Sequence, residues 1–133
     1  MVATAGMLVL AACGGNEEES MQHDMHVATV DTVGLRAKVV PTEFQPGLER
    51  FKASCAPCHG EAALGTAQGP PLVHIYYEPG HHSDTAFRMA VARGVPQHHW
   101  NFGNMPPIDG IGPQDLDALI AYVRWLQREA GIR

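Results

Sequence analysis

The chain has 133 residues, enough for one compact domain with an extension and too few for two domains of ordinary size. Hydrophobic residues make up 45% and charged residues 17%, a globular composition that excludes wholesale disorder, a collagen-like chain and a protein made mostly of membrane spans. Nine Lys and Arg against fourteen Asp and Glu give a net charge of −5, so no basic surface for nucleic acid is expected.

The first of the three cysteines, Cys13, follows an uncharged apolar stretch that is too short to span a bilayer. Leu10-Ala11-Ala12-Cys13 resembles a bacterial lipoprotein signal, in which the peptide is cut before the cysteine and the cysteine receives lipid. We therefore expect a signal peptide over residues 1–12, lipid on Cys13, and a membrane-anchored protein on the periplasmic or extracytoplasmic side. No Lys or Arg precedes Cys13, which departs from a usual signal and suggests a start upstream of Met1. The alternative is a buried free cysteine on a short apolar helix.

Residues 13–46 form an acidic extension in front of the predicted domain. They carry six acidic and two basic residues, whereas residues 47–133 carry eight acidic and seven basic ones. Most of the negative charge therefore lies in a tether, and the domain is nearly neutral. The β-branched residues between 27 and 40 can form a short strand or wrap on the core, although a glycine and a proline interrupt them. The methionines and histidines of residues 21–26 can be soft copper ligands or part of a solvated linker.

The motif Cys55-Ala56-Pro57-Cys58-His59 has the C-x-x-C-H pattern of a c-type haem attachment site. Two cysteines three residues apart on a helical turn have Cβ atoms roughly 5–6 Å apart, so both sulfurs can reach the two vinyl groups of one porphyrin. His59 can then place a neutral imidazole nitrogen on the iron. The motif therefore predicts one covalently bound haem c, with Cys55 and Cys58 as its attachment points and His59 as an iron ligand.

Three other chemistries can use the same cysteines. A thioredoxin-like redox pair is expected after a strand in a βαβ pattern, which the Gly- and Pro-rich sequence after His59 does not offer. A zinc finger needs two further ligands at regular spacing, and the later histidines do not supply them. A plain disulfide between Cys55 and Cys58 leaves the histidine unexplained. The haem interpretation is therefore favoured.

Three segments have the pattern of a helix. The first begins near Gly47 and precedes the motif, and the second runs from Ser83, a plausible N-cap, to Gly94. The third begins at Gly112-Pro113 with acidic residues in its first turn and can end at Gly131. This third segment has apolar residues at helical spacing and basic residues in its later turns: Leu116, Leu119, Ile120, Val123, Leu126, Arg124 and Arg128.

Together these features resemble class I cytochromes c over nearly all of residues 47–129. In that family a helix with a glycine and a phenylalanine before C-x-x-C-H crosses a C-terminal helix that bears an aromatic residue. Gly47, Phe51 and Tyr122 occupy those positions here. The resemblance implies an all-α cytochrome c fold with three main helices and loops around one haem, preceded by an irregular N-terminal extension. The implied domain covers residues 47–133.

The resemblance also implies roles for residues outside the motif. The family has a G-P-x-L loop, seen here as Gly69-Pro70-Pro71-Leu72, in which the carbonyl of Pro70 accepts the second ring N–H of His59 and Leu72 packs on the haem. The sixth iron ligand is usually a methionine on a loop before the last helix. Met105, between Asn104 and two prolines, stands in that place and is the predicted ligand. A methionine that only fills a gap in the core is the alternative.

The segment 74–100 resembles the family least. The pairs His81-His82 and His98-His99 can coordinate a metal, replace Met105 or face water. Tyr76, Tyr77 and Trp100 can point a polar group at the haem propionates, or they can simply pack.

A His/Met pair fills both axial positions of the iron, so the expected function is one-electron transfer rather than catalysis. We expect a monomeric, membrane-tethered carrier whose family analogy implies a quinol-oxidising complex as donor and a terminal oxidase as acceptor. The alternatives are the cytochrome subunit of a larger oxidoreductase, a ligand-binding haem enzyme, and a haemless redox or zinc module.

Overall fold

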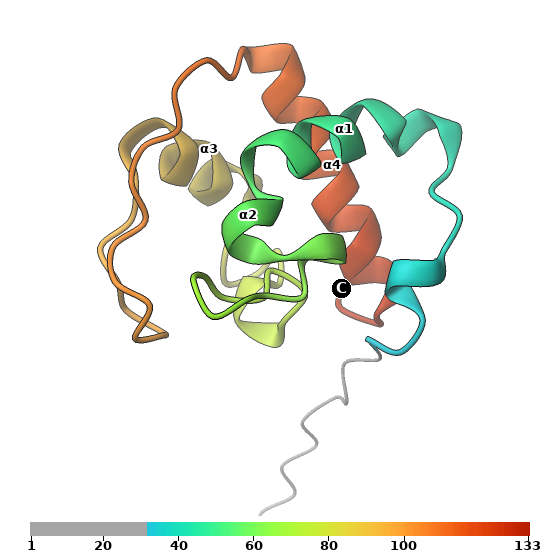
Figure 1. Ribbon diagram of the computed structural model, residues 1–133, viewed down its shortest axis with the longest axis horizontal. Helices are drawn as coiled ribbons and strands as arrows, with labels where there is room; N and C mark the ends of the chain where they lie inside the picture. The colour runs from blue at the N-terminus through green and yellow to red at the C-terminus, as the bar shows by residue number, and fades with distance from the viewer. Residues whose placement is uncertain (1–31) are drawn as a thin grey trace, which may run out of the picture.

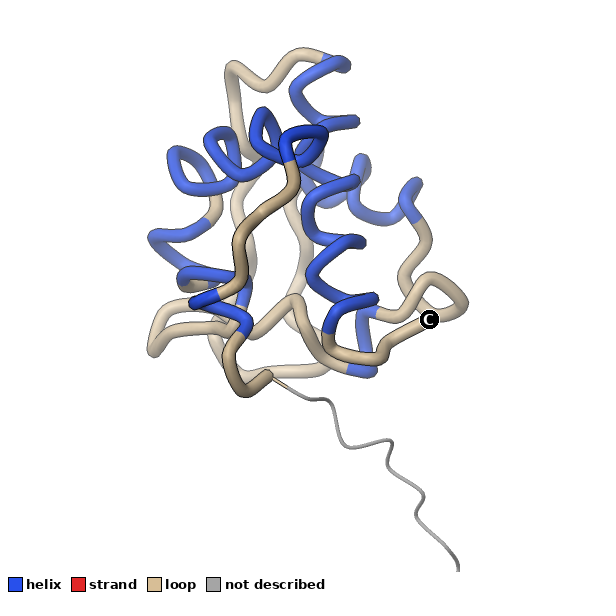
Figure 2. Tube along the Cα trace, turned by 90° about the vertical axis from the view of Figure 1, so that its right-hand side faces the viewer, coloured by secondary structure: helices blue, strands red, loops and turns tan. Residues whose placement is uncertain are grey.

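The structure is a computed structural model that describes residues 32–133. The predicted signal peptide, Cys13 and the possible copper ligands of residues 21–26 lie outside this range. Within it the chain forms four α-helices and four short 3-10 helices, and no strand (Figures 1 and 2). The elements in chain order are η1 (Leu35–Ala37), η2 (Thr42–Phe44), α1 (Gln45–Ser54), α2 (Ala56–His59), η3 (Glu61–Ala63), η4 (Ile75–Tyr77), α3 (Asp84–Arg93) and α4 (Pro113–Glu129). The all-α prediction is confirmed.

The three predicted helices form α1, α3 and α4. The Ser83 hydroxyl accepts a hydrogen bond from the Ala86 N–H and caps α3, and Gly94 follows its last turn. Helix α4 begins at Pro113, as expected. Helix α1 begins two residues earlier than Gly47 and continues to the motif, which forms the additional short helix α2.

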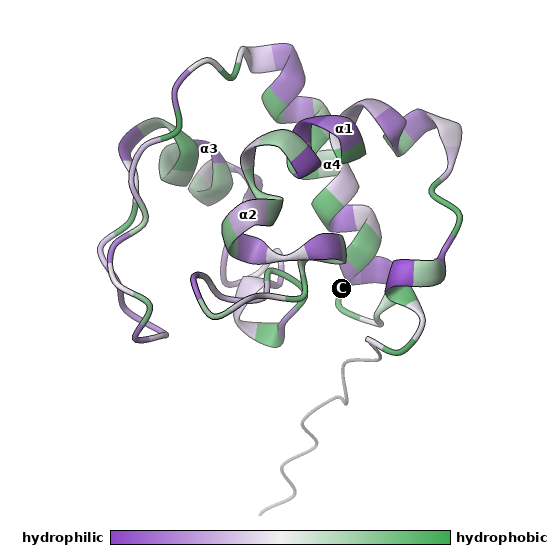
Figure 3. Ribbon diagram, viewed as in Figure 1, coloured by the Kyte–Doolittle hydropathy of each residue, from purple (hydrophilic) through white to green (hydrophobic). Residues whose placement is uncertain are grey.

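Helix α1 crosses α4, and this crossing is the centre of the core (Figure 1). The rings of Phe51 and Tyr122 meet there with centroids 5.6 Å apart, and both side chains are almost fully buried. Apolar and polar residues alternate along α4 in Figure 3, but its second half is buried on all sides, since each residue from Tyr122 to Gln127 is buried. The predicted aromatic crossing is therefore present.

The described part of the extension packs against the domain. Leu35 is 3% exposed and joins the hydrophobic core, and the ring of Phe44 stacks on Trp125 with centroids 5.7 Å apart. Lys38 forms an ion pair of 2.7 Å with Glu129 at the end of α4. In the described part of residues 27–40, Leu35 and Val40 pack on the core, whereas Val33 and Val39 are exposed. The packed unit thus includes residues before 47. The change in charge at residue 47 does not mark its start, because charge does not reveal buried apolar contacts.

None of the helices within residues 32–133 is long and apolar enough to cross a membrane.

Candidate functional site

Helix α2 places the three residues of the predicted attachment motif. Cys55 precedes its first turn, Cys58 and His59 lie within it, and the His59 N–H donates to the Cys55 carbonyl at 2.8 Å. Neither thiol forms a disulfide within residues 32–133. Burial raises the pKa of the Cys55 thiol to about 11, and the nearby Cys58 adds to the rise. Both sulfurs therefore project from one short helix, and the Cys55 thiol is protonated at neutral pH.

The ring of His59 is held in one orientation by the loop that follows the motif. Its Nδ1 lies 2.9 Å from the carbonyl oxygen of Pro70, and because a carbonyl can only accept, Nδ1 carries the proton. Burial lowers the pKa of His59, and the bond to Pro70 opposes that shift. The result is a neutral imidazole whose Nε2 lone pair is available to a metal. The hydrogen bond that the resemblance implied is present.

The loop after the motif returns to it through backbone hydrogen bonds. The Gly65 N–H donates to the His59 carbonyl at 2.6 Å, and the Leu72 N–H donates to the Ala63 carbonyl at 2.8 Å. These bonds bring Pro70 against His59 and place Leu72 at the wall of the same cavity.

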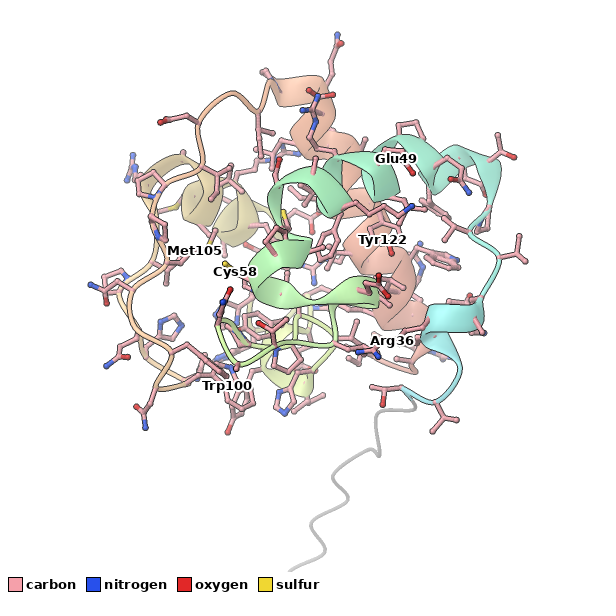
Figure 4. All side chains as sticks on the ribbon, in the orientation of Figure 1. Arg36, Glu49, Cys58, Trp100, Met105 and Tyr122 are labelled. Atoms are coloured by element: carbon pink, nitrogen blue, oxygen red, sulfur yellow. The ribbon has the colours of Figure 1, made fainter. Side chains whose placement is uncertain are left out.

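One cavity brings together the predicted site residues. Cys58, Met105 and Trp100 all line it, and Figure 4 shows Cys58 on α2 and Met105 and Trp100 on the loop before α4. Much of the remaining wall is apolar, from the loop after the motif, from helices α3 and α4 and from the loop between them: Leu72, Phe87, Val91, Val95, Ile108 and Leu119. A wall of this kind suits a large, flat, apolar group such as a porphyrin.

Met105 is held by its backbone. Its N–H donates to the Val95 carbonyl and its carbonyl accepts from the Val95 N–H, both at 2.9 Å, which closes the loop 96–104 at its neck. Gly94 makes the close approach possible, because its φ is +71° and a Cβ there would lie 3.0 Å from the Pro107 nitrogen and closer still to the Met105 carbonyl oxygen. From the sequence, only the two prolines after Met105 were expected to position it. The Gly94-Val95-Pro96 sequence was the signal that could have indicated the backbone pairing of Val95 with Met105.

The loop that leads to Met105 also carries a buried donor. The indole Nε1 of Trp100 is buried and makes no regular hydrogen bond to any described residue. Burial raises the pKa of Tyr77, and the nearby indole of Trp100 opposes that rise. Tyr77 and Trp100 both line the cavity. The two attachment cysteines, the neutral ring of His59 and the apolar wall of the cavity fit a haem.

Arg124 has a structural role that the sequence did not reveal. The sequence pattern identified it only as a basic residue in a later turn of the last helix. Arg124 is 7% exposed and donates to the Asp84 carboxylate at 2.8 Å and to the backbone carbonyls of Tyr77 and His82. Gln127 adds a bond of 2.8 Å to the Leu72 carbonyl. These two side chains bind the segment 72–82 to α4. Because this segment forms one side of the cavity wall, the same hydrogen bonds hold that side in place.

The cytochrome c family model matches residues 44–127, more than half of the chain. The chain belongs to the cytochrome c family. Comparisons with curated proteins and with solved structures gave no match. Members of this family bind covalent haem c, and Cys55 and Cys58 with the adjacent His59 fit its attachment motif. The protein is accordingly a c-type cytochrome, and a haemless redox or zinc module is no longer the best interpretation. The ligand roles of His59 and Met105 remain predictions.

Proposed function

We propose that this cytochrome is a monohaem one-electron carrier, tethered to a membrane, that takes electrons from a quinol-oxidising complex and passes them to a terminal oxidase. The observation that carries the electron-transfer part is that His59 and Met105, an imidazole and a thioether, line one apolar cavity beside the attachment cysteines. Haem held between such ligands supplies a single electron at a time through the iron and leaves no open position for a substrate.

The residues of the chain tune this role. The neutral His59 ring, oriented by Pro70, supplies a nitrogen ligand of defined tautomer. The thioether of Met105 is a soft ligand that favours the ferrous state, and the apolar wall disfavours the extra charge of the ferric state. Both effects raise the reduction potential relative to a site with two histidines.

A carbon monoxide experiment tests the closed site. The dithionite-reduced protein at neutral pH should bind carbon monoxide slowly or not at all, because both axial positions are filled. Rapid binding would contradict the carrier function and favour a ligand-binding haem enzyme. A preparation that shows no haem absorbance would contradict the assignment of cofactor and function together.

The proposed partners meet a nearly neutral surface. Residues 47–133 carry eight acidic and seven basic residues, so docking should depend mainly on apolar contacts around the haem edge near the exposed Cys58. The rate of electron transfer to an oxidase-containing membrane should therefore change only weakly as ionic strength rises. A steep fall with salt would contradict this mode of docking.

The proposed tether places the domain near both membrane partners. Lipid on Cys13 would restrict diffusion to the membrane surface on the extracytoplasmic side and raise the effective concentration at each partner. Mass spectrometry of the mature protein should find an N-terminal lipidated Cys13, and Cys13→Ser should move the haem protein from the membrane fraction to the soluble fraction. A wild-type protein that is soluble with an intact N-terminus would contradict the tether.

A further inference from the structure

Two histidine pairs from separate segments meet at the edge of the cavity. The Nε2 atoms of His81 and His99 are 3.2 Å apart, and those of His82 and His98 are 3.4 Å apart. The imidazole rings pack on one another, with the centroids of His98 and His99 separated by 4.4 Å. The two segments thus present four imidazoles to one small volume.

The proton positions in one pair follow from its backbone contacts. The Nδ1 of His82 is hydrogen bonded to the Tyr76 carbonyl, and the Nδ1 of His98 lies 2.9 Å from the Pro96 carbonyl. Carbonyl oxygens only accept, so each Nδ1 carries a proton, and in the neutral rings each Nε2 carries a lone pair. Two lone pairs therefore face each other across 3.4 Å, an arrangement that becomes favourable when a cation lies between them.

The spacing of the ring nitrogens also fits a tetrahedral metal site. In a tetrahedral zinc site with Zn–N bonds of about 2.0–2.1 Å, neighbouring ligand nitrogens are about 3.3 Å apart. Both histidine pairs have this separation, and one ligand nitrogen from each of His81, His82 and His99 lies within 4.8 Å of the other two. A movement of the side chains, without refolding of the backbone, would complete the set.

The histidine cluster is partly preorganised by its neighbours. The backbone carbonyl of His82 accepts a hydrogen bond from Arg124, which ties its segment to α4, and the ring of His99 stacks on Tyr76 with centroids 4.7 Å apart. The bonds from Nδ1 of His82 and His98 to carbonyls are of the kind that orient histidine ligands in metal sites.

We propose that His81, His82 and His99, with His98 as a fourth ligand, bind a divalent transition-metal ion that is separate from the haem iron. Neutral imidazoles without carboxylates or thiolates suit Zn²⁺ and Cu²⁺ rather than Mg²⁺ or Ca²⁺. Such an ion would join the segment 78–83 to the loop 96–104, whose neck holds Met105. Its charge would lie beside the cavity that His82, His98 and His99 line, and would make the ferric state less favourable.

Zinc titration of the purified ferric protein by calorimetry tests the site. The wild type should bind one Zn²⁺. The double variant His81→Ala/His99→Ala should bind Zn²⁺ about 100-fold more weakly, or weaker still. The control His23→Ala/His26→Ala removes two histidines outside the described residues and should keep the wild-type affinity. The proposal is overturned if the first double variant binds as the wild type does, or if the control abolishes binding.

A redox titration and a visible spectrum distinguish metal binding at this site from iron ligation. Zn²⁺ should raise the midpoint potential of the wild type and leave that of His81→Ala/His99→Ala unchanged. In the absence of added metal, that double variant should keep the wild-type visible spectrum; a change in the axial-ligand bands would mean that these imidazoles bind iron and would overturn the proposal. If the protein proved colourless, the proposed function would fail, whereas the zinc stoichiometry would still decide the metal site.

Discussion

Gly47 of α1 lies directly against Tyr122 of α4: a Cβ on the glycine would be 2.7 Å from the Cβ of Tyr122 and closer still to the carbonyl oxygen of Ala118. The two helices can cross at this distance only because residue 47 has no side chain. This contact sets the position of α1, and α1 leads directly into the haem attachment motif. Core packing and site geometry are therefore coupled at one residue.

Gly47→Ala should separate the helices and destabilise the fold by about 2–4 kcal/mol, despite the better helix propensity of alanine. Urea unfolding of the holoprotein measures the loss. Gly80→Ala is the matched control, because nothing lies within 4 Å of the Cβ that it adds. Equal stability of the two variants would contradict the close-packed crossing.

The buried phenol of Tyr122 should make stability fall at high pH. Burial raises its pKa to about 12, above the value near 10 of an unfolded chain. The unfolded state then releases its proton first, so the stabilisation is complete below about pH 10 and is lost as pH rises through about 12. Tyr122→Phe keeps the ring contact with Phe51 and should flatten the dependence of the unfolding free energy on pH in this window. An unchanged slope in the variant would assign the effect to other groups.

Arg124→Met should cost about 3 kcal/mol of stability, because the carbonyls of Tyr77 and His82 and the side chain of Asp84 lose a common buried donor. Chemical denaturation measures this change. Arg128→Met on the exposed face of α4 is the control and should change stability by less than about 1 kcal/mol. Arg124→Met should also loosen the segment 72–82, which faster amide hydrogen exchange there would reveal.

Met105→Ala should open the sixth position of the iron, change the visible spectrum, lower the midpoint potential and permit carbon monoxide binding to the reduced protein. Met89→Ala provides the control, since Met89 is 48% exposed on α3. An unchanged spectrum in Met105→Ala would move the sixth ligand elsewhere, and the His98→Ala variant would show whether an imidazole has that role.

Several features could be predicted because the residues that determine them are neighbours in the chain. The cysteine spacing of the attachment motif, the apolar periodicity of α4 and the Ser83 cap of α3 each depend on contacts within one or two turns. The family pattern added the crossing of Phe51 with Tyr122, which the structure contains. Element type and the attachment residues therefore followed from the sequence itself.

Other features depended on contacts between distant residues. The pattern of α4 does not distinguish Arg124 from Arg128, yet Arg124 is buried because Asp84, 40 positions away, and two loop carbonyls meet it there. The same holds for Val95 with Met105, for Leu35 in the core and for the pairing of His81 with His99 across 18 positions. Local propensity carries no information about which segments the chain brings together, and only the packed fold determined these partners.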